Sequence, residues 1–150
     1  MIKYLEQLFK PHQKKRNSKT SCYTYFRMAG DFKTEDISIL LSLTPFETFD
    51  IGEVRRGGRG KYDFALWSYG YNADYTADVG EQLLDTIKDL EKRIDILNEI
   101  RKKYDVAFFL EIVPEMIVDD THPAIYFDEK IIEFCYLTKT GIDIDMYIYK

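Results

Sequence analysis

The chain has 150 residues, of which 45% are hydrophobic and 31% charged, with two cysteines and a net charge of −5 at pH 7. This is the length of one globular domain, two cysteines are too few for a disulfide framework, and no apolar run approaches the roughly 18 residues of a membrane-spanning helix. Because the N-terminal residues carry charges inside their only apolar stretch, they do not resemble a signal peptide, and we expect a cytoplasmic protein without a membrane partner.

The N-terminal segment, residues 1–20, is expected to lie outside the domain. Its first residues, Ile2–Phe9, have the apolar spacing of a short amphipathic helix, which Pro11 would end. The segment then carries basic side chains and no acid: Lys14, Lys15, Arg16 and Lys19. Such a run is typical of a solvated linker, so we place one domain at residues 21–150.

Two long strands are predicted in the first half of this domain. Ser21–Gly30 alternates side chains with a period of two, which is typical of a strand. A helix is expected to follow, capped by Thr34 and ended before Pro45, and then a short strand at Phe46–Ile51. Tyr62–Tyr71 repeats the alternation and predicts the second long strand.

A long amphipathic helix is predicted next. Asp78 is a good N-cap residue, and apolar residues then recur at steps of three and four as far as Tyr104, with a break expected near Asp89. Val106–Val113 is apolar on both faces apart from Glu111. That pattern predicts an interior strand covered on both sides.

The end of the chain is predicted to hold a loop at residues 114–122, a short strand at Pro123–Phe127, a helix capped by Asp128 and a final strand at Ile142–Tyr149. This order of elements predicts an α+β fold, in which two or three helices pack on a mixed, mostly antiparallel sheet. We expect a ferredoxin-like core with an added C-terminal β-α-β extension.

Charge is divided unevenly along the chain. Residues 1–61 have a net charge of +5, whereas residues 62–150 have a net charge of −10. A chain that is acidic as a whole is a poor general binder of nucleic acid, although Lys14, Lys15 and Arg16 keep that alternative open. An acidic surface is better suited to a basic protein partner, whose approach it would accelerate.

The loop at residues 52–61 contains four glycines and three arginines: Arg55, Arg56 and Arg59. Arginine forks bind phosphate or carboxylate, and glycines allow the backbone to approach a ligand closely. Together with Trp67 and Tyr69 of the following strand, the arginines would form a binding site for an anion or a small molecule. The loop lacks the ending of a P-loop and precedes a strand, so we favour a flexible basic hairpin.

Asp143 and Asp145 are expected on one face of the last strand, roughly 7 Å apart and followed by Tyr147 on the same face. Paired carboxylates can hold a divalent cation or act as acid and base, but we favour a solvated strand face. No metal-binding, nucleophile or redox motif occurs, so we predict no metal and no cofactor. No set of residues argues for an enzyme, and that question stays open.

Short motifs that occur in order along the chain provide one further indication: Gly30-Asp31, Leu43-Thr44-Pro45, Gly52-Glu53 with Arg55 and Arg56, Trp67, and Asp143-Ile144-Asp145 with Tyr147. Their order and spacing, over about residues 21–149, resemble a bacterial family known only as a domain of unknown function. The resemblance implies a role like that of immunity proteins, which inhibit bacterial toxins without catalysis. It supplies no catalytic residues.

We therefore expect a protein-binding domain whose partner is a basic protein, such as a toxin. A small-molecule or anion binder that uses the arginine loop is the first alternative, and a nucleic-acid binder is the second. A homodimer stays open as well. The candidate binding residues are Arg55, Arg56, Arg59, Trp67, Tyr69, Asp143, Asp145 and Tyr147.

Overall fold

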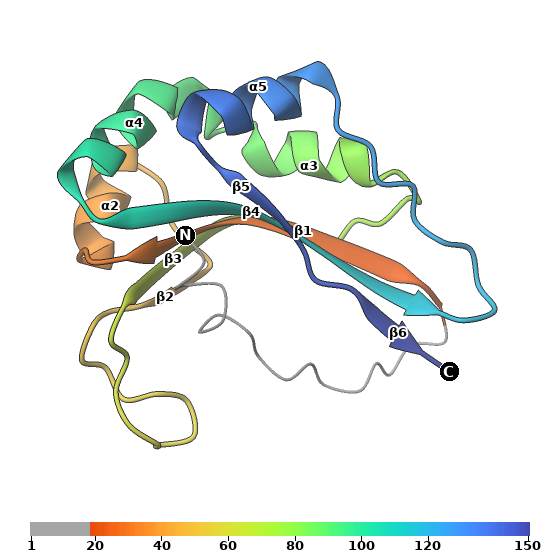
Figure 1. The fold of residues 1–150 in the computed structure, drawn as a ribbon, viewed down its shortest axis with the longest axis horizontal. Coiled ribbons are helices and arrows are strands. Elements are labelled where there is room, and N and C mark those ends of the chain that lie inside the picture. The colour runs from red at the N-terminus through yellow and green to blue at the C-terminus, as the bar shows by residue number, and fades with distance from the viewer. Residues whose placement is uncertain (1–18) are drawn as a thin grey trace.

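The structure is a computed structural model that describes residues 19–150. The short helix and most of the basic linker expected before the domain lie outside the described residues. The described chain forms a six-stranded mixed sheet with helices packed on it, which confirms the predicted α+β class (Figure 1). No helix within residues 19–150 combines the length and the apolar character needed to cross a membrane.

The strands are β1 (Ser21–Gly30), β2 (Glu47–Phe49), β3 (Ala65–Asn72), β4 (Val106–Ile117), β5 (Gly141–Ile144) and β6 (Tyr147–Tyr149). The helices are α2 (Thr34–Leu41), α3 (Val79–Ile87), α4 (Ile94–Lys103) and α5 (Glu129–Thr138), with a 3₁₀ turn, η1 (Glu91–Arg93), before α4.

The sheet is centred on β1, which pairs antiparallel with β3 on one side and β4 on the other. The strand order is β2-β3-β1-β4-β5; β2 pairs antiparallel with β3, and β5 and β6 both pair parallel with β4. The predicted mixture of antiparallel and parallel pairing is therefore present. The narrower description of a ferredoxin-like core stays a prediction.

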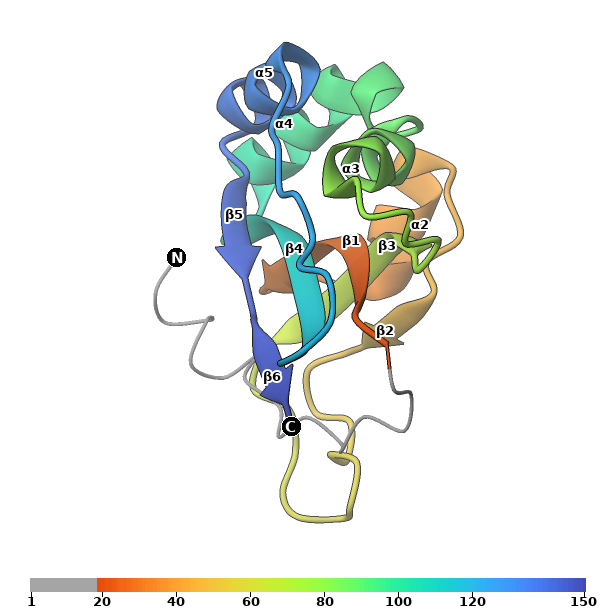
Figure 2. The ribbon, with the colours of Figure 1, turned by 90° about the vertical axis from the view of Figure 1, so that its right-hand side faces the viewer.

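The main core fills the space between the sheet and its helices, which stand on one face of the sheet (Figure 2). The strands contribute every second residue to it, including Phe26, Met28 and Trp67, because side chains alternate between the two faces of a strand. The helices contribute Leu83 and Phe134 among others. A smaller cluster lies apart from this core: Ala29, Phe49, Phe64, Leu66, Ala107 and Phe109.

The break expected in the long helix is confirmed. α3 ends at Ile87, and α4 begins only at Ile94, so Asp89 lies between the two helices. No proline or glycine occurs in this turn, and its position is instead stabilised by tertiary contacts. Arg93 donates from Nη1 to the carbonyl of Asp89 at 2.7 Å and from Nε to the carbonyl of Leu41 at the end of α2.

The N-terminus of α2 is capped differently from the prediction. Thr34 is the first helical residue, and the preceding Lys33 makes no side-chain cap. The cap comes from Asp50, whose carboxylate accepts from the Thr34 backbone N–H at 2.8 Å and from its hydroxyl at 3.0 Å. A residue beyond β2 therefore satisfies the helix end, which no local pattern at Thr34 could indicate.

The predicted end of β4 and the short strand after it were wrong. β4 continues through Pro114 to Ile117, where a loop was expected. The segment Pro123–Phe127 forms no strand, and only Ala124 makes an isolated bridge, to Asp78. The C-terminal extension is thus α5 followed by β5 and β6, without a strand before the helix.

The predicted last strand is present but interrupted. Ile112 pairs with Ile144 in β5, and Glu115 pairs with Tyr147 in β6. Both partners lie three residues further along the chain, so β5 and β6 share one register with β4. The Ile112 carbonyl accepts from the Asp145 N–H at 2.9 Å, and the next residue of β4 that faces this side is Pro114. Since proline has no N–H, the ladder loses one bond and the strand divides into β5 and β6.

Candidate functional site

The sheet face opposite the helices carries a row of polar and aromatic side chains, which we call the polar face. The register defines it, because directly paired residues share a face. Arg27 pairs with Ser68, Tyr25 with Glu111, and Glu111 with Asp143. By the same alternation the polar face comprises Tyr23, Tyr25, Arg27, Glu47, Ser68, Glu111, Glu115, Asp143, Asp145 and Tyr147.

The centre of the polar face is a buried cluster around Arg27 and Glu111, which are 6% and 2% exposed. Arg27 Nη2 donates to the hydroxyl of Tyr25 at 2.6 Å, and its guanidinium lies 5.0 Å from the centre of the same ring. Arg27 Nη1 lies 3.6 Å from Glu111 Oε1, beyond hydrogen-bond distance. Arg27 Nε, Glu111 Oε1 and the hydroxyl of Ser68 are buried and have no hydrogen-bond partner among residues 19–150.

Burial raises the pKa of Glu111 to about 8, against the opposing effect of Arg27 and with a further increase from Asp143 and Asp145. At neutral pH the Glu111 carboxyl is therefore mostly protonated, and Arg27 lies beside a neutral acid rather than in a strong ion pair. A buried cation beside a buried acid with a raised pKa is an arrangement that often marks a functional site.

An aromatic strip borders this cluster. The ring of Tyr25 meets that of Phe46 at 5.5 Å, Phe46 meets Tyr71 at 5.3 Å, and Tyr71 meets Tyr23 at 5.5 Å between ring centres. Phe46 and Tyr71 are about half exposed. Exposed aromatic rings of this kind are common in protein-binding surfaces.

The predicted acidic residues Asp143, Asp145 and Tyr147 do lie together, at the β5–β6 edge of the polar face. Asp143 lies beside Glu111 across the parallel pair, and Asp145 accepts a hydrogen bond from the Tyr147 hydroxyl at 2.7 Å. Burial, and then the bond to Asp145, raise the pKa of Tyr147. Within residues 19–150 no three acidic, histidine or cysteine side chains are grouped as metal ligands would be.

The arginines of the 52–61 loop are placed near acids. Arg55 Nη2 lies 3.6 Å from Asp63 Oδ1, and Arg55 Nε donates to the carbonyl of Lys61 at 3.2 Å. Arg56 Nη2 lies 3.5 Å from Glu47 Oε1, while Arg59 is exposed. Because two of the three guanidiniums have carboxylate neighbours, the loop is less available to an external anion than its sequence indicates.

Trp67 and Tyr69 are not brought together with these arginines. Both lie on the face of β3 that the helices cover, where Trp67 is fully buried and donates from Nε1 to the hydroxyl of Ser38 at 3.0 Å. Tyr69 stacks on Trp67 at 5.8 Å and donates to Asp89 at 2.7 Å. The structure therefore does not assemble the anion site that the sequence suggested from these five residues.

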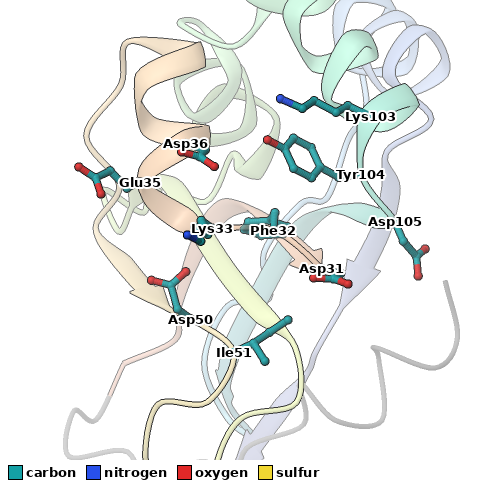
Figure 3. Close-up of a pocket in the computed structure, with 10 residues that line it drawn as sticks. All are labelled: Asp31, Phe32, Lys33, Glu35, Asp36, Asp50, Ile51, Lys103, Tyr104 and Asp105. Carbon is teal, nitrogen blue, oxygen red and sulfur yellow. The ribbon is translucent and has the colours of Figure 1, made fainter.

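A separate pocket of about 800 Å³ lies where β1 ends (Figure 3). Figure 3 shows Lys103 and Tyr104 extending from the end of α4 toward α2 across this pocket. Carboxylates outnumber lysines in its lining: Asp31, Glu35, Asp36, Asp50 and Asp105 against Lys33 and Lys103. The pocket would thus favour a cationic group over an anion.

Sequence reasoning missed the Arg27–Glu111 cluster, although both residues carried a signal. Glu111 is the only charge in an otherwise apolar stretch, and Arg27 is the only charge in β1. Their proximity depends on the pairing of Tyr25 with Glu111, which neither strand specifies alone.

Comparison with known proteins gives one finding about relationship. No curated protein and no solved structure matches the chain significantly. A family model described as a domain of unknown function, DUF4279, matches residues 20–149. This match covers nearly the whole described chain, including the polar face, the pocket and the arginine loop. The chain therefore belongs to the DUF4279 family.

Proposed function

We propose that this protein is a non-enzymatic protein-binding domain that captures a basic protein, as an immunity-type inhibitor of a bacterial toxin would. The observation that carries the proposal is the concentration of acidic residues in the C-terminal third of the chain. Residues 104–150 contain three Lys and Arg against ten Asp and Glu, and they form α5 and the strands β4, β5 and β6, which are neighbours in the sheet.

This acidic side also offers apolar contact area. Four side chains along the last strand are between 40% and 65% exposed: Ile142, Ile144, Met146 and Ile148. Protein interfaces commonly combine an apolar centre with a charged rim, and an acidic field accelerates the approach of a basic partner. The combination of apolar and acidic side chains at one edge supports protein binding better than the binding of a small ligand.

The two alternatives receive less support. An anion site in the arginine loop would have to compete with Asp63 and Glu47 for Arg55 and Arg56. The nucleic-acid hypothesis uses residues 14–16, which lie outside the described residues, together with the same arginine loop.

The experiment uses the product of the adjacent gene as the partner. The purified protein should form a stable complex with it, and the association rate should fall steeply as salt is added. Co-expression should also protect cells from that product. The charge reversal Asp145→Lys should slow association, whereas Glu53→Lys, on the exposed 52–61 loop, should change it little. A neighbouring product that is neither bound nor neutralised would contradict the proposal.

A further inference from the structure

The outer edge of the last strand has backbone groups that point away from the sheet. Within residues 19–150, β5 and β6 pair only with β4. The Asp145 N–H donates to β4, and the Tyr149 carbonyl accepts from Val118 at the end of β4. Since backbone direction alternates along a strand, Ile142 and Ile144 direct their N–H and C=O groups outward.

The side chains beside these outward groups differ between the two faces of the sheet. Ile142 and Ile144 are 40% and 42% exposed and lie on the side of the helices, because they pair with the buried core residues Leu110 and Ile112. Asp143 lies on the polar face. Residues 141–149 contain no Lys, Arg or Pro, which are common protecting residues at sheet edges.

A strand added at this edge would place its own side chains alternately on the two faces. Those on the helix side would contact Ile142 and Ile144, and those on the polar side would lie beside Asp143 and Asp145. Neighbouring side chains of opposite charge stabilise such a pair, and like charges destabilise it. The edge therefore fits a strand in which apolar residues alternate with Lys or Arg.

A second copy of this chain fits the edge poorly. Two antiparallel copies of the last strand would bring Asp143 and Asp145 of one copy close to the same carboxylates of the other. Like charges on neighbouring strands repel, so the acidic pair disfavours self-association while it favours a basic partner.

We propose that the partner binds by adding one β-strand, with alternating apolar and basic side chains, to the outer edge of β5 and β6. This inference rests on the proposed function and specifies its binding mode. Backbone hydrogen bonds to Ile142 and Ile144 would supply much of the affinity, and the isoleucines and aspartates would select the sequence.

The test uses a synthetic peptide of alternating lysine and valine, with binding followed by calorimetry and by NMR of the whole protein. We expect saturable binding, with exchange of the Ile142 and Ile144 amides slowed at least about tenfold. A peptide of alternating glutamate and valine should not bind. A peptide of the same composition as the first, with its lysines and valines in separate blocks, should bind at least about tenfold more weakly than the alternating peptide.

Two variants of Ile144 test the backbone and the side chain of the edge separately. Ile144→Pro removes an outward N–H that does not bond to β4, and Ile144→Lys adds a charge that repels the lysines of the peptide. Both should weaken binding about tenfold or more. Ile39→Lys, at a 68% exposed position on α2, is the matched control and should leave binding unchanged.

The outcomes separate this inference from the proposed function. If the adjacent gene product binds with a salt-sensitive rate but both Ile144 variants bind it normally, strand addition is overturned and protein binding stands. If neither the gene product nor the peptide binds, both proposals fail. If the Ile142 and Ile144 amides become more protected as the protein concentration rises in the absence of any peptide, the edge binds a second copy of the chain. That result would overturn the inference.

Discussion

Gly30 is a single residue on which the junction of β1 and β4 depends. A Cβ atom at this position would lie 2.1 Å from the carbonyl oxygen of Asp105, and a backbone atom cannot move aside as a side chain end can. The same junction contains the hydrogen bond from the Asp31 N–H to the Asp105 carbonyl at 2.9 Å. Glycine is required here by close approach and not by an unusual φ angle.

We therefore expect Gly30→Ala to lower the free energy of unfolding by about 2–3 kcal/mol in urea titration, because the two strands must separate locally. Gly58→Ala is the control: Gly58 has a φ of 74° but no atom within 4 Å of the added Cβ. Its cost should be about 1 kcal/mol, from backbone conformation alone. Equal losses in the two variants would show that close packing at Gly30 is unimportant.

Glu111 gives the stability of the protein a specific pH dependence. Burial raises its pKa from 4.5 to about 8 in the folded protein. Between these values the unfolded chain releases the proton while the folded protein retains it, so this residue lowers the free energy of unfolding as pH rises. Glu111→Gln cannot titrate, and the stability of the variant relative to wild type should rise by about 1 kcal/mol per pH unit within this window.

Urea titrations of both proteins at a series of pH values measure this difference. A difference that stays constant across this pH range would mean that the Glu111 carboxyl is ionised in the folded protein.

The grouping of site residues could be predicted only where the residues lie on the same strand. Asp143, Asp145 and Tyr147 share a face because they are two residues apart, and the structure places them together. The contact of Arg27 with Glu111 joins residues far apart in sequence, and no local pattern encodes it.

At the scale of whole elements, the two-residue period identified β1, β3 and the last strand because successive side chains of a strand point to opposite faces of the sheet, even though β1 is buried on both faces along most of its length. The same reasoning ended β4 too early at Pro114. The proline is tolerated in β4 because the N–H that it lacks would have pointed toward β5, and the pairing with β1 is unaffected. The helix break and the cap from Asp50 depend on contacts outside each element.

Pro114→Ala should restore the missing bond between β4 and the last strand. The new N–H would face the Asp145 carbonyl, so hydrogen exchange should show the residue 114 amide protected to a similar extent as that of Ile112. The net gain in stability should stay below about 1 kcal/mol, because alanine also increases the freedom of the unfolded chain. Free exchange at residue 114 would contradict this explanation of the interrupted strand.

At the scale of the whole molecule, the predicted α+β class is confirmed, whereas the ferredoxin-like arrangement of the core strands stays a prediction. The position of β1 between β3 and β4 depends on the combined packing of all elements. The two cysteines are both buried, Cys22 in the central strand and Cys135 in α5. Burial raises the pKa of their thiols to about 12 and about 11.

A thiol reagent should therefore react slowly with the native protein and at once in denaturant. Cys135 is 8% exposed and should react first, after local opening of α5, whereas Cys22 is 1% exposed and should react only on global unfolding. Cys135→Ser isolates the second reaction. If Cys22 reacted as fast as a free thiol in native buffer, the central strand would be more accessible than the structure indicates.

The placement of all described helices on one side of the sheet divides the strands into two kinds of position. In β1, even-numbered residues such as Phe26 and Met28 lie in the core, while odd-numbered ones such as Tyr23 and Tyr25 lie on the opposite face of the sheet. Residues on that face can thus change without repacking the core beneath the helices. During evolution, residues on that face could therefore be substituted to bind a new partner while the fold stays the same.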